Sequence, residues 1–487
     1  RAALGAGAIV MDVLASNDGR LYHEKVKRIR QLRPDMILLS GGVDGGTVSH
    51  VVELSEILEA ANPKPRLGLN YKLPVIYAGN NKATDEISKR LSNMTDLTIV
   101  DNIRPTLDYE NLKPSRDKIH DLFMEHVMAQ APGYKKLMSW ADTPIMPTPG
   151  AVGEIIKKIA KVNNKSVVGV DIGGATTDVF SVFEGKFNRT VSANLGMSYS
   201  VCNVLAESGY ENVLRWIPFE IDNDDLTNRI SNKMIRPTTI PQTLDGLIFE
   251  QAIAREALRL SFIQHKEFAV ELKGVQKERT ISDAFDQSAS GKSLVDMNKL
   301  DMIVGSGGVL SHAPRRNQAA MMLIDSFLPE GVTELAVDSI FMMPQLGILS
   351  TIHKEAAVQV FEKDCLIRLG TCIAPFDCRY EGEILDYSFN INGNTVDGTL
   401  KSGEVKLIKA DFNAYDAILK PLNGFDIGIG NNEVLEKSIY GGEIGIILDG
   451  RGRSPLNIPS GTKHRIKKSI EWSRAIDQYP DLELINV

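Results

Sequence analysis

The chain has 487 residues, which is long enough for two or three domains with hydrophobic cores of their own. Hydrophobic residues make up 43% and charged residues 24%, a composition typical of globular proteins, and the formal net charge is −7. This acidic balance argues against nucleic-acid binding through a broad basic surface.

Cysteine and histidine usage indicates a reducing compartment and no zinc site. The four cysteines contain no Cys-x-x-Cys pair, and the eight histidines are scattered. No apolar stretch is long enough to cross a bilayer and no signal-peptide pattern opens the chain, so we expect a cytoplasmic protein without membrane contact. The first residues, Arg1-Ala-Ala-Leu-Gly-Ala-Gly-Ala, lack a Met and resemble the end of a helix, which predicts a missing N-terminal part.

The first hundred residues alternate strand-like and helix-like segments. Helical patterns near 22–32, 49–61 and 83–91 separate short apolar runs. This rhythm predicts parallel strands joined by crossover helices. The expected strands cover Ile9–Val13, Met36–Leu39, Val75–Ala78 and Leu97–Val100.

The middle of the chain begins with a boundary and a meander. A helix is expected near 115–131, and the proline-rich loop Thr143-Pro-Ile-Met-Pro-Thr-Pro-Gly150 then marks the best internal boundary. After one more helix, β-rich segments follow each other across short turns, which predicts a three-strand meander. These segments are Ser166–Val170, Val179–Phe183 and Lys186–Val191.

The first turn of this meander is the most informative segment: Asp171-Ile-Gly-Gly-Ala-Thr-Thr-Asp178. Two glycines allow amide N–H groups to approach an anion, two threonines add hydroxyl donors, and two aspartates supply oxygen ligands suited to Mg²⁺. A second strand, not a helix, follows, and no Gly-Lys-Ser/Thr closes the turn. The dinucleotide fingerprint and the P-loop are therefore excluded here, and a phosphate-holding hairpin is predicted.

Downstream, helices are expected near 198–207 and 244–263, and a buried strand at 300–304 ends in Gly305-Ser306-Gly307-Gly308. From about residue 355 alternating segments with Asn-Gly turns predict a small β-rich part, closed by a helix over 463–475. The predicted domains are 1–145, 146–354 and 355–487.

A weak internal duplication is visible. Met36-Ile-Leu-Leu-Ser-Gly-Gly-Val43 and Met302-Ile-Val-Gly-Ser-Gly-Gly-Val309 both suggest a strand that runs into a Gly-Gly turn and a helix. The second copy follows a meander. By symmetry, the meander of the first half should lie upstream of Arg1.

Several motifs together resemble a known family. The phosphate hairpin, the later Gly-Gly turn and the duplicated plan resemble the actin-like ATPase superfamily. More narrowly, the chain is similar to the MutL/GlmL accessory-protein family linked to glutamate mutase, which is unrelated to the mismatch-repair protein of similar name. The motifs are Val170–Phe180, Ala193-Asn-Leu-Gly-Met197, Val304–Val309, Met343-Pro-Gln-Leu-Gly-Ile-Leu349 and Leu38–Gly46. This resemblance implies a duplicated actin-like (RNase H-like) α/β fold with an N-terminally truncated first half and a C-terminal β-rich domain.

The resemblance also implies an ATP- and Mg²⁺-binding site. Asp171 would hold Mg²⁺ through water, and Asp178 would position the attacking water. The turn residues Gly173, Gly174, Ala175, Thr176 and Thr177 would contact the phosphates. The adenosine side would lie on Gly305, Ser306, Gly307 and Gly308. Two simpler interpretations stay open: Asp178 could only orient the hairpin, and Gly307-Gly308 could be only a strand-to-helix turn. Asp44, in the early glycine loop, is left out of the site.

The resemblance further implies an ATP-dependent reactivating chaperone, with slow ATPase activity, that exchanges damaged cobalamin on an adenosylcobalamin-dependent mutase or aminomutase. Glutamate mutase, an ornithine or lysine aminomutase and a methylmalonyl-type mutase all remain open as the partner, as does the oligomeric state. One alternative is a small-molecule kinase of the same fold with Asp44 as its base. Another is a scaffold that no longer binds nucleotide.

Overall fold

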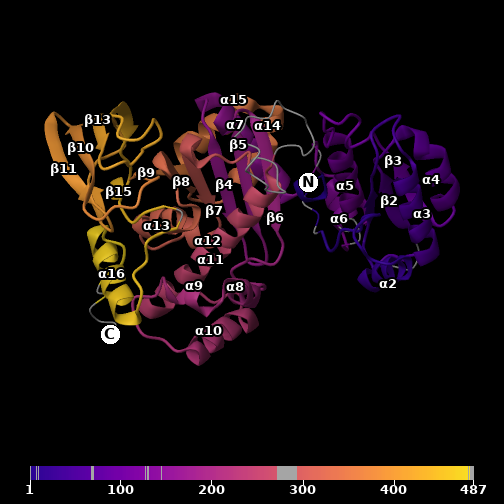
Figure 1. Ribbon diagram of the computed structural model, residues 1–487, viewed down its shortest axis with the longest axis horizontal. Coiled ribbons are helices and arrows are strands. Elements are labelled where there is room, and N and C mark those ends of the chain that lie inside the picture. Colours follow the sequence, from indigo (N-terminus) through magenta and orange to yellow (C-terminus); the bar gives the residue numbers. More distant parts are fainter. Residues whose placement is uncertain are drawn as a thin grey trace. The chain divides into compact units, whose positions relative to one another are not determined.

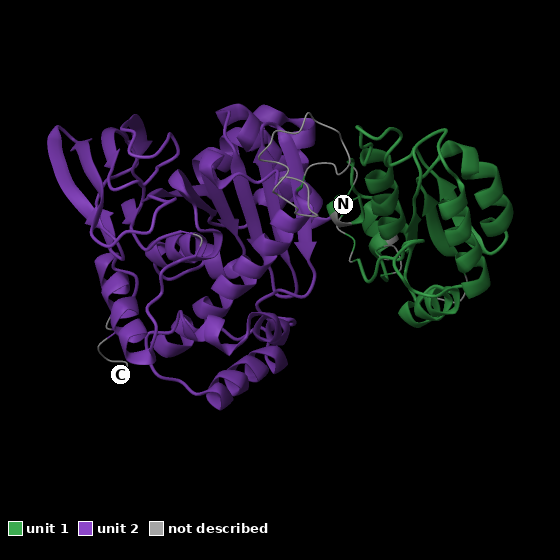
Figure 2. Ribbon diagram, in the orientation of Figure 1, with its two compact units in different colours: residues 1–146, 270–292 green, residues 147–269, 293–487 purple. Residues whose placement is uncertain are grey.

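The computed structural model describes most of the chain between residues 2 and 482. The residues it leaves out within that range are 7, 9, 67–70, 127, 129, 130, 144, 271–292, 454 and 481. Two compact units divide the chain: unit 1 comprises residues 1–146 and 270–292, and unit 2 comprises residues 147–269 and 293–487 (Figure 2).

Unit 1 is built on a three-stranded parallel sheet in the order β1-β2-β3 (Figure 1). The strands alternate with helices, as the sequence rhythm predicts, and the residues of α2 and α3 coincide with the predicted helical segments. The elements are α1 (Ala2–Gly5), α2 (Tyr22–Leu32), β1 (Ile37–Leu39), α3 (Ser49–Ala61), β2 (Leu73–Tyr77), η1 (Asn81–Ala83), α4 (Thr84–Leu91), β3 (Thr95–Ile99), α5 (Lys113–His126) and α6 (Tyr134–Met138).

The prediction of a first strand at Ile9–Val13 is wrong for residues 10–13, which the structure describes. Residues 10–13 belong to no helix or strand, and Val13 is 72% exposed. The core of unit 1 instead gathers α2, α3 and α4 around β2, whose five residues are all buried. Unit 1 shows only parallel strand pairs among its described residues. The meander of a first half, expected upstream of Arg1, stays a prediction.

Unit 2 contains an eight-stranded mixed sheet in the order β12-β15-β9-β8-β7-β4-β5-β6. The predicted meander is confirmed: β4, β5 and β6 pair antiparallel, and β7 then lies parallel to β4 on its other side. The strands are β4 (Val167–Ile172), β5 (Thr177–Phe183), β6 (Lys186–Ser192), β7 (Met302–Ser306), β8 (Gly331–Asp338), β9 (Leu366–Ala374), β12 (Val405–Ile408) and β15 (Gly445–Asp449).

Helices cover both faces of this sheet. One face packs against α8, α11 and α13, and the other against α7, α14 and α15. None of the helices described is both long enough and apolar enough to span a bilayer. The helices and short turns of unit 2 are α7 (Thr148–Asn163), α8 (Val201–Ser208), α9 (Tyr210–Leu214), α10 (Asn223–Ile235), α11 (Leu244–Phe268), η4 (Met297–Lys299), α12 (Gly308–Ser311), α13 (Arg316–Phe327), α14 (Met343–Ile352), α15 (Lys354–Val360), η5 (Phe361–Cys365) and α16 (Thr462–Ala475).

The C-terminal third is β-rich, as predicted, but its strands enter two sheets. Residues 355–487 contribute β9, β12 and β15 to the large sheet and also form a separate antiparallel sheet, β11-β10-β13-β14. Asn392-Gly393, with φ angles of 53° and 82°, makes the predicted hairpin turn. A third apolar cluster packs this sheet against β9 and β15. Its strands are β10 (Glu383–Ile391), β11 (Asn394–Lys401), β13 (Ala414–Pro421) and β14 (Leu435–Tyr440).

A buried ionic network fixes the C-terminal part to the rest of unit 2. The Arg451 guanidinium, 2% exposed, pairs with Asp449 at 2.8 Å and with Asp325 of α13 at 2.9 Å. Asp325 in turn accepts a hydrogen bond from Arg255 of α11 at 2.6 Å. Because removing one member would leave a buried charge unpaired, the network specifies how β15, α13 and α11 are assembled.

Helices α7 and α14 approach each other through a glycine. A Cβ at Gly347 of α14 would lie 1.9 Å from the Ala151 carbonyl oxygen of α7, whereas a Cβ at Gly150 would meet nothing closer than 3.7 Å. We expect Gly347→Ala to destabilise the protein by about 1–3 kcal/mol through overpacking. The control Gly150→Ala should be neutral or stabilise by up to ~1 kcal/mol through helix propensity. Urea unfolding of both variants measures the difference, and equal stabilities would contradict the packing argument.

Candidate functional site

The turn between β4 and β5 has free N–H groups and occupied carbonyl groups. All four of its carbonyls accept hydrogen bonds. The Gly173 carbonyl accepts from Met197 N, and the Gly174 carbonyl accepts from both Ser198 N and Tyr199 N. The Ala175 carbonyl accepts from Ser200 Oγ, and the Thr176 carbonyl accepts from Gly173 N. The N–H groups of Gly174, Ala175 and Thr176 donate to no acceptor among the described residues. Three successive free donors are an arrangement that binds anions in many proteins.

Two glycines outside the turn, Gly196 and Gly307, allow their segments to pack directly against its backbone. A Cβ at Gly196 would lie 2.5 Å from the Ala175 carbonyl carbon, and a Cβ at Gly307 would lie 2.1 Å from the Ile172 carbonyl oxygen. Gly307 also has a φ of 102°, which side-chain-bearing residues rarely adopt. The predicted phosphate turn and the predicted adenosine turn are therefore in direct backbone contact.

The second turn supplies open backbone beside this contact. Gly305 lies within β7, where a Cβ would crowd Leu310 and Leu323 of the core. Gly308 is exposed, and a Cβ there would meet no atom within 4 Å. Of the glycines in this turn, Gly308 thus leaves room for a ligand, while Gly307 serves the packing against Ile172.

A row of polar side chains crosses the sheet just below the two turns. Asp171 of β4 pairs in register with Asp178 of β5 and with Ser306 of β7. The side chains of cross-strand partners point to the same face of a sheet. Here it is the face covered by α7 and α14, because Gly169, two residues before Asp171 on the same strand, faces Ile156 of α7. Asp178 Oδ1 and Ser306 Oγ are buried and have no hydrogen-bond partner among the residues that the structure describes. Unpartnered buried oxygens at this position fit a polar ligand that completes the site.

Asp338 extends the row by one strand, a residue that the sequence analysis missed. Gly305 pairs with Val337, so Asp338, at the end of β8, comes next to Ser306. Its carboxylate is fully buried and accepts hydrogen bonds from Ile340 N at 3.3 Å and Met343 N at 2.8 Å. Asp338 therefore holds the first turn of α14 and also places a third carboxyl group in the row.

Burial raises the pKa values of these carboxyl groups. Burial, with the neighbouring Asp338, raises the pKa of Asp171 to about 6. Burial, with Asp171 as its neighbour, raises the pKa of Asp178 to about 7, against the opposing effect of Arg189. Burial also raises the pKa of Asp338. Carboxylates crowded in this way favour a site that receives a cation or shares protons.

The two threonines of the turn differ in what their hydroxyls do. Thr177 is completely buried, and its Oγ1 donates to the Leu195 carbonyl at 2.5 Å. Thr176 is half-buried, and its hydroxyl has no hydrogen bond within the described part of the chain. Thr176 is thus the threonine free to contact a phosphate, and Thr177 ties the hairpin to the segment after β6.

A basic cavity lies next to the turn. Its volume is about 420 Å³, and Met197, whose N–H is bound to Gly173, lines it together with Phe249 and Ile253. Arg229, Lys233 and Arg236 also line the cavity, together with Glu250, which pairs with Lys233 at 3.2 Å. Ser198 Oγ donates to the Pro237 carbonyl at 2.8 Å, which ties the rim of the cavity to the turn.

In unit 1, Asp44 holds loops together. Its Oδ1 accepts hydrogen bonds from Asn81 N and from Asn102 Nδ2, both at 3.0 Å, and its own N–H donates to the Pro105 carbonyl. These bonds link the loops that follow β1, β2 and β3. Asp44 thus accepts structural hydrogen bonds through Oδ1.

The described residues contain no group of three or more His, Cys, Asp or Glu side chains that could hold a metal ion by themselves. Mg²⁺ is commonly bound by one or two carboxylates together with water and substrate phosphates, so a site built on Asp171 alone fits this ion. The donor set therefore matches Mg²⁺ brought with a nucleotide.

Comparison with known proteins identifies the family. A family model described as MutL protein matches residues 1–365 of the chain. The chain belongs to the MutL protein family. The resemblance seen in its motifs is thereby confirmed. Protein MutL of Clostridium tetanomorphum is 27% identical over 392 residues, which are 74% of this chain and 79% of that protein.

Solved structures give weaker likenesses. Component A of the (R)-2-hydroxyglutaryl-CoA dehydratase of Acidaminococcus fermentans is 12% identical, with 66% of this chain and 86% of that chain covered and a TM-score of 0.22. A Bacillus thuringiensis ParM hybrid protein with ADP is also 12% identical, with 74% and 43% covered and a TM-score of 0.19. At these scores the likenesses carry no argument about the MutL-family chain.

The site predicts an unusual pH dependence of stability without Mg²⁺ or nucleotide. The folded-state pKa values of about 6 for Asp171 and about 7 for Asp178 lie above the ordinary value of 3.8. Their contribution to stability is therefore fully present below about pH 3.8 and is lost as the pH rises through 6 to 7. We expect Asp178→Asn to be more stable than the wild type at pH 8, on the order of 2 kcal/mol, with a much smaller difference at pH 5.

Urea unfolding in EDTA at the two pH values measures this difference. Asp416→Asn, an exposed carboxylate on β13, is the control for the loss of one negative charge. A stability difference for Asp178→Asn that is the same at pH 5 and pH 8 would contradict the assignment.

The packing of Gly196 predicts a second effect. A Cβ there would push Ala175 and Gly174 out of place, so Gly196→Ala should weaken MgATP binding by about tenfold or more while the core of the sheet remains. Gly185→Ala is a suitable control, because its positive φ of 74° strains an alanine but no atom lies within 4 Å. Calorimetric titration distinguishes the variants, and equal affinities would exclude the turn from the binding site.

Proposed function

We propose that this MutL-family protein binds MgATP at the β4–β5 turn and hydrolyses it slowly. The observation that carries the proposal is the polarity of the turn, whose carbonyl groups are occupied while three successive N–H groups are free. A phosphate is the ligand that such a set of donors favours. The open backbone at Gly308, beside the same turn, supports placing the adenosine there.

Backbone N–H groups of the turn and two aspartate side chains would carry the binding and the hydrolysis. The N–H groups of Gly174, Ala175 and Thr176 would hold phosphate oxygens, and Asp171 would hold Mg²⁺ through a water molecule. When bound, Mg²⁺ supplies charge neutralisation at the phosphates. Asp178, whose Oδ1 lacks a partner, would orient the attacking water and accept its proton, for which its raised pKa of about 7 is suitable.

Family membership supports an accessory role for a glutamate-mutase-type enzyme. We propose that the protein is a cytoplasmic reactivating chaperone, which uses ATP to exchange damaged cobalamin on an adenosylcobalamin-dependent mutase or aminomutase. Binding energy and hydrolysis at the turn would drive this exchange by favouring one arrangement of the protein in the ATP state and another after hydrolysis.

We prefer this proposal to a small-molecule kinase because family membership supports an accessory role. Such a kinase would require a base at the acceptor hydroxyl, for which Asp44 is the candidate from the sequence. A scaffold without nucleotide remains the second candidate, and MgATP binding decides between the two.

The first experiment measures binding and hydrolysis separately. We expect the wild type to bind MgATP in a calorimeter, and Asp178→Asn to retain binding within a few-fold while hydrolysis falls by about a hundredfold. Asp416→Asn should leave both unchanged. Absence of a MgATP signal from the wild type would favour the scaffold.

The second experiment measures the proposed chaperone action. A candidate mutase inactivated with hydroxocobalamin is mixed with the protein, ATP and fresh adenosylcobalamin. We expect recovery of mutase activity with the wild type and ATP, and none with Asp178→Asn. Equal recovery with and without ATP for every candidate mutase would exclude an ATP-dependent reactivase.

A further inference from the structure

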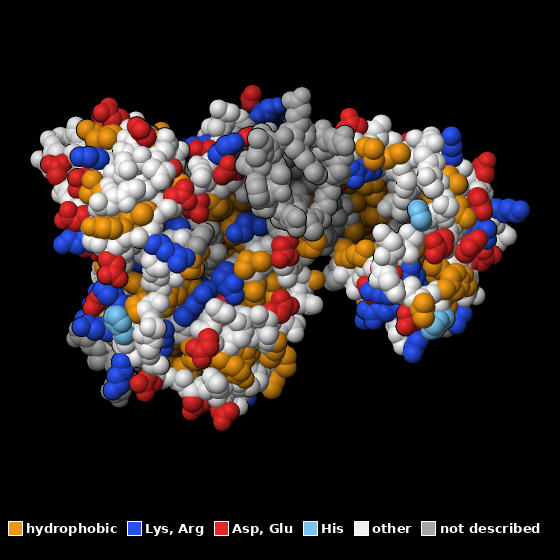
Figure 3. Space-filling model, viewed as in Figure 1, with side chains coloured by type: hydrophobic (Ala, Val, Ile, Leu, Met, Phe, Trp, Pro, Cys, Tyr) orange, Lys and Arg blue, Asp and Glu red, His pale blue; other side chains and the backbone are white. Residues whose placement is uncertain are grey.

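Helix α2 of unit 1 is strongly basic within an acidic protein. Residues 20–33 contain six Lys or Arg and one acidic residue, Glu24, whereas the whole chain has a formal charge of −7. Figure 3 shows Lys and Arg side chains gathered at the end of unit 1 where Figure 1 places α2. The charge of this surface is therefore opposite to that of the chain as a whole.

Several acidic side chains near α2 are paired with its cations. Asp12 accepts from Arg28 at 2.5 Å and from Arg20 at 3.3 Å, and Asp18 pairs with Lys25 at 3.2 Å. Glu24 accepts from the Leu21 N–H. On the neighbouring helices, Glu56, Glu59 and Glu86 share Arg90. Within the described part of the chain, His23, Lys27 and Arg33 have neither an ion pair nor a side-chain hydrogen bond.

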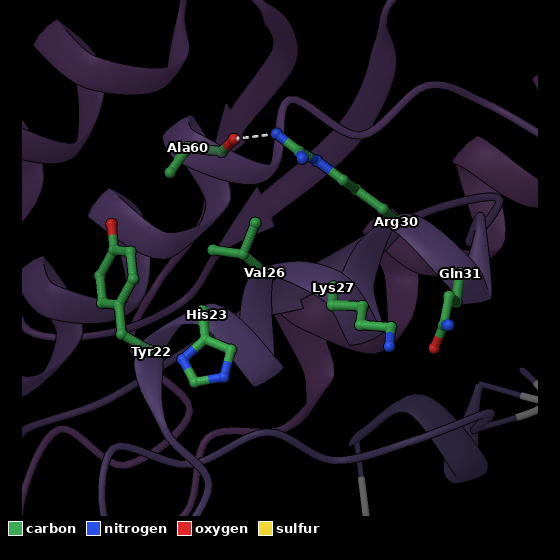
Figure 4. Close-up of a pocket in the computed structure, with 7 residues that line it drawn as sticks. All are labelled: Tyr22, His23, Val26, Lys27, Arg30, Gln31 and Ala60. Carbon is green, nitrogen blue, oxygen red and sulfur yellow. Dashed lines mark hydrogen bonds between the residues drawn. The ribbon is translucent and has the colours of Figure 1, made fainter.

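A groove of about 560 Å³ runs along this charged side of α2 (Figure 4). Its apolar wall consists of Val26 and Ala60, and Tyr22 lies at one end. The α2 groove, as we call it, is lined by Tyr22, His23, Val26, Lys27, Arg30, Gln31 and Ala60.

Arg30 is held in place beside this groove. Its Nε donates to the Ala61 carbonyl at 3.0 Å and its Nη2 to the Ala60 carbonyl at 2.8 Å, so the guanidinium caps the end of α3. Nη1 has no hydrogen bond among the described residues. A guanidinium fixed in this way loses little entropy when it binds a carboxylate. His23, Lys27 and Arg30 span roughly 10 Å along α2, since a helix rises about 1.5 Å per residue.

We propose that the α2 groove docks an acidic segment of a partner protein, whose carboxylates meet Lys27 and Arg30 while its apolar side chains contact Tyr22 and Val26. Identifying this partner as the mutase rests on the proposed function. The lining of the groove selects the occupant. It contains Lys27 and Arg30 and no acidic residue, so a carboxylate-bearing segment supplies the complementary charge.

Other anionic partners fit less well. Binding to a nucleic acid usually requires several phosphate contacts, and among the described residues the groove is lined by two Lys or Arg side chains, Lys27 and Arg30. A membrane-surface helix needs a free apolar face, but Ile29 of α2 is 5% exposed and belongs to the core of unit 1. An acidic protein segment requires only a short groove and a few cations, which α2 provides.

The test uses the full chain and a fluorescein-labelled peptide of twelve glutamates, monitored by fluorescence anisotropy at low salt. We expect wild-type binding that weakens as salt is added, and a loss of affinity of about fivefold or more for Lys27→Glu. The matched control is Lys89→Glu on α4, an exposed lysine of the same unit with the same change of charge, which should bind like the wild type.

Three results would overturn the proposal: no binding by the wild type, equal binding by Lys27→Glu and Lys89→Glu, or a tighter, equally Lys27-dependent binding of an RNA oligonucleotide or of phosphatidylserine vesicles. Unfolding midpoints of both variants exclude loss of fold. If the peptide binds as expected but ATP restores no mutase, the groove stands and the proposed function fails. If ATP restores a mutase equally well with Lys27→Glu and Lys89→Glu, the mutase is not the occupant.

Discussion

The site of unit 2 depends on the segment 195–200, which folds back over the β4–β5 turn. Backbone N–H groups of Met197, Ser198 and Tyr199 and the Ser200 hydroxyl occupy the carbonyl groups of the turn. Without these hydrogen bonds, the turn would present free carbonyl groups and free N–H groups together, and their opposite partial charges would largely cancel. With the carbonyls engaged, N–H groups without an acceptor among the described residues dominate, an arrangement that favours anions even in a loop without lysine or arginine. Gly196 allows this arrangement because no side chain fits between the two segments.

The sequence predicts local elements of this protein well. The residues of α2 and α3 coincide with the helices predicted near 22–32 and 49–61, since apolar periodicity is a strong local signal. The glycines and aspartates of the β4–β5 turn were found for a similar reason. Their residue types have few other uses at that spacing.

Properties that depend on distant residues were not predictable. Nothing local in β9, β12 and β15 shows that they join the large sheet, because strand patterns do not name a partner. Asp338 enters the polar row only through the pairing of β7 with β8. The segment 10–13 is apolar enough to suggest a strand, but it finds no partner among the described residues. The different tasks of Thr176 and Thr177 also appear only when Leu195 lies beside the hairpin.

Asp338 serves two structures at once. Its carboxylate binds the N–H groups that open α14, and its charge acts on Asp171 across β7. A cation that binds at Asp171 would therefore also relieve the repulsion felt by Asp338 and strengthen its hold on α14. If cation binding strengthens the packing of α14 against α7, then by thermodynamic reciprocity tighter packing at Gly347 favours cation binding, with the same coupling free energy in both directions. Helix packing would then tune a cation site to which α14 contributes no ligand.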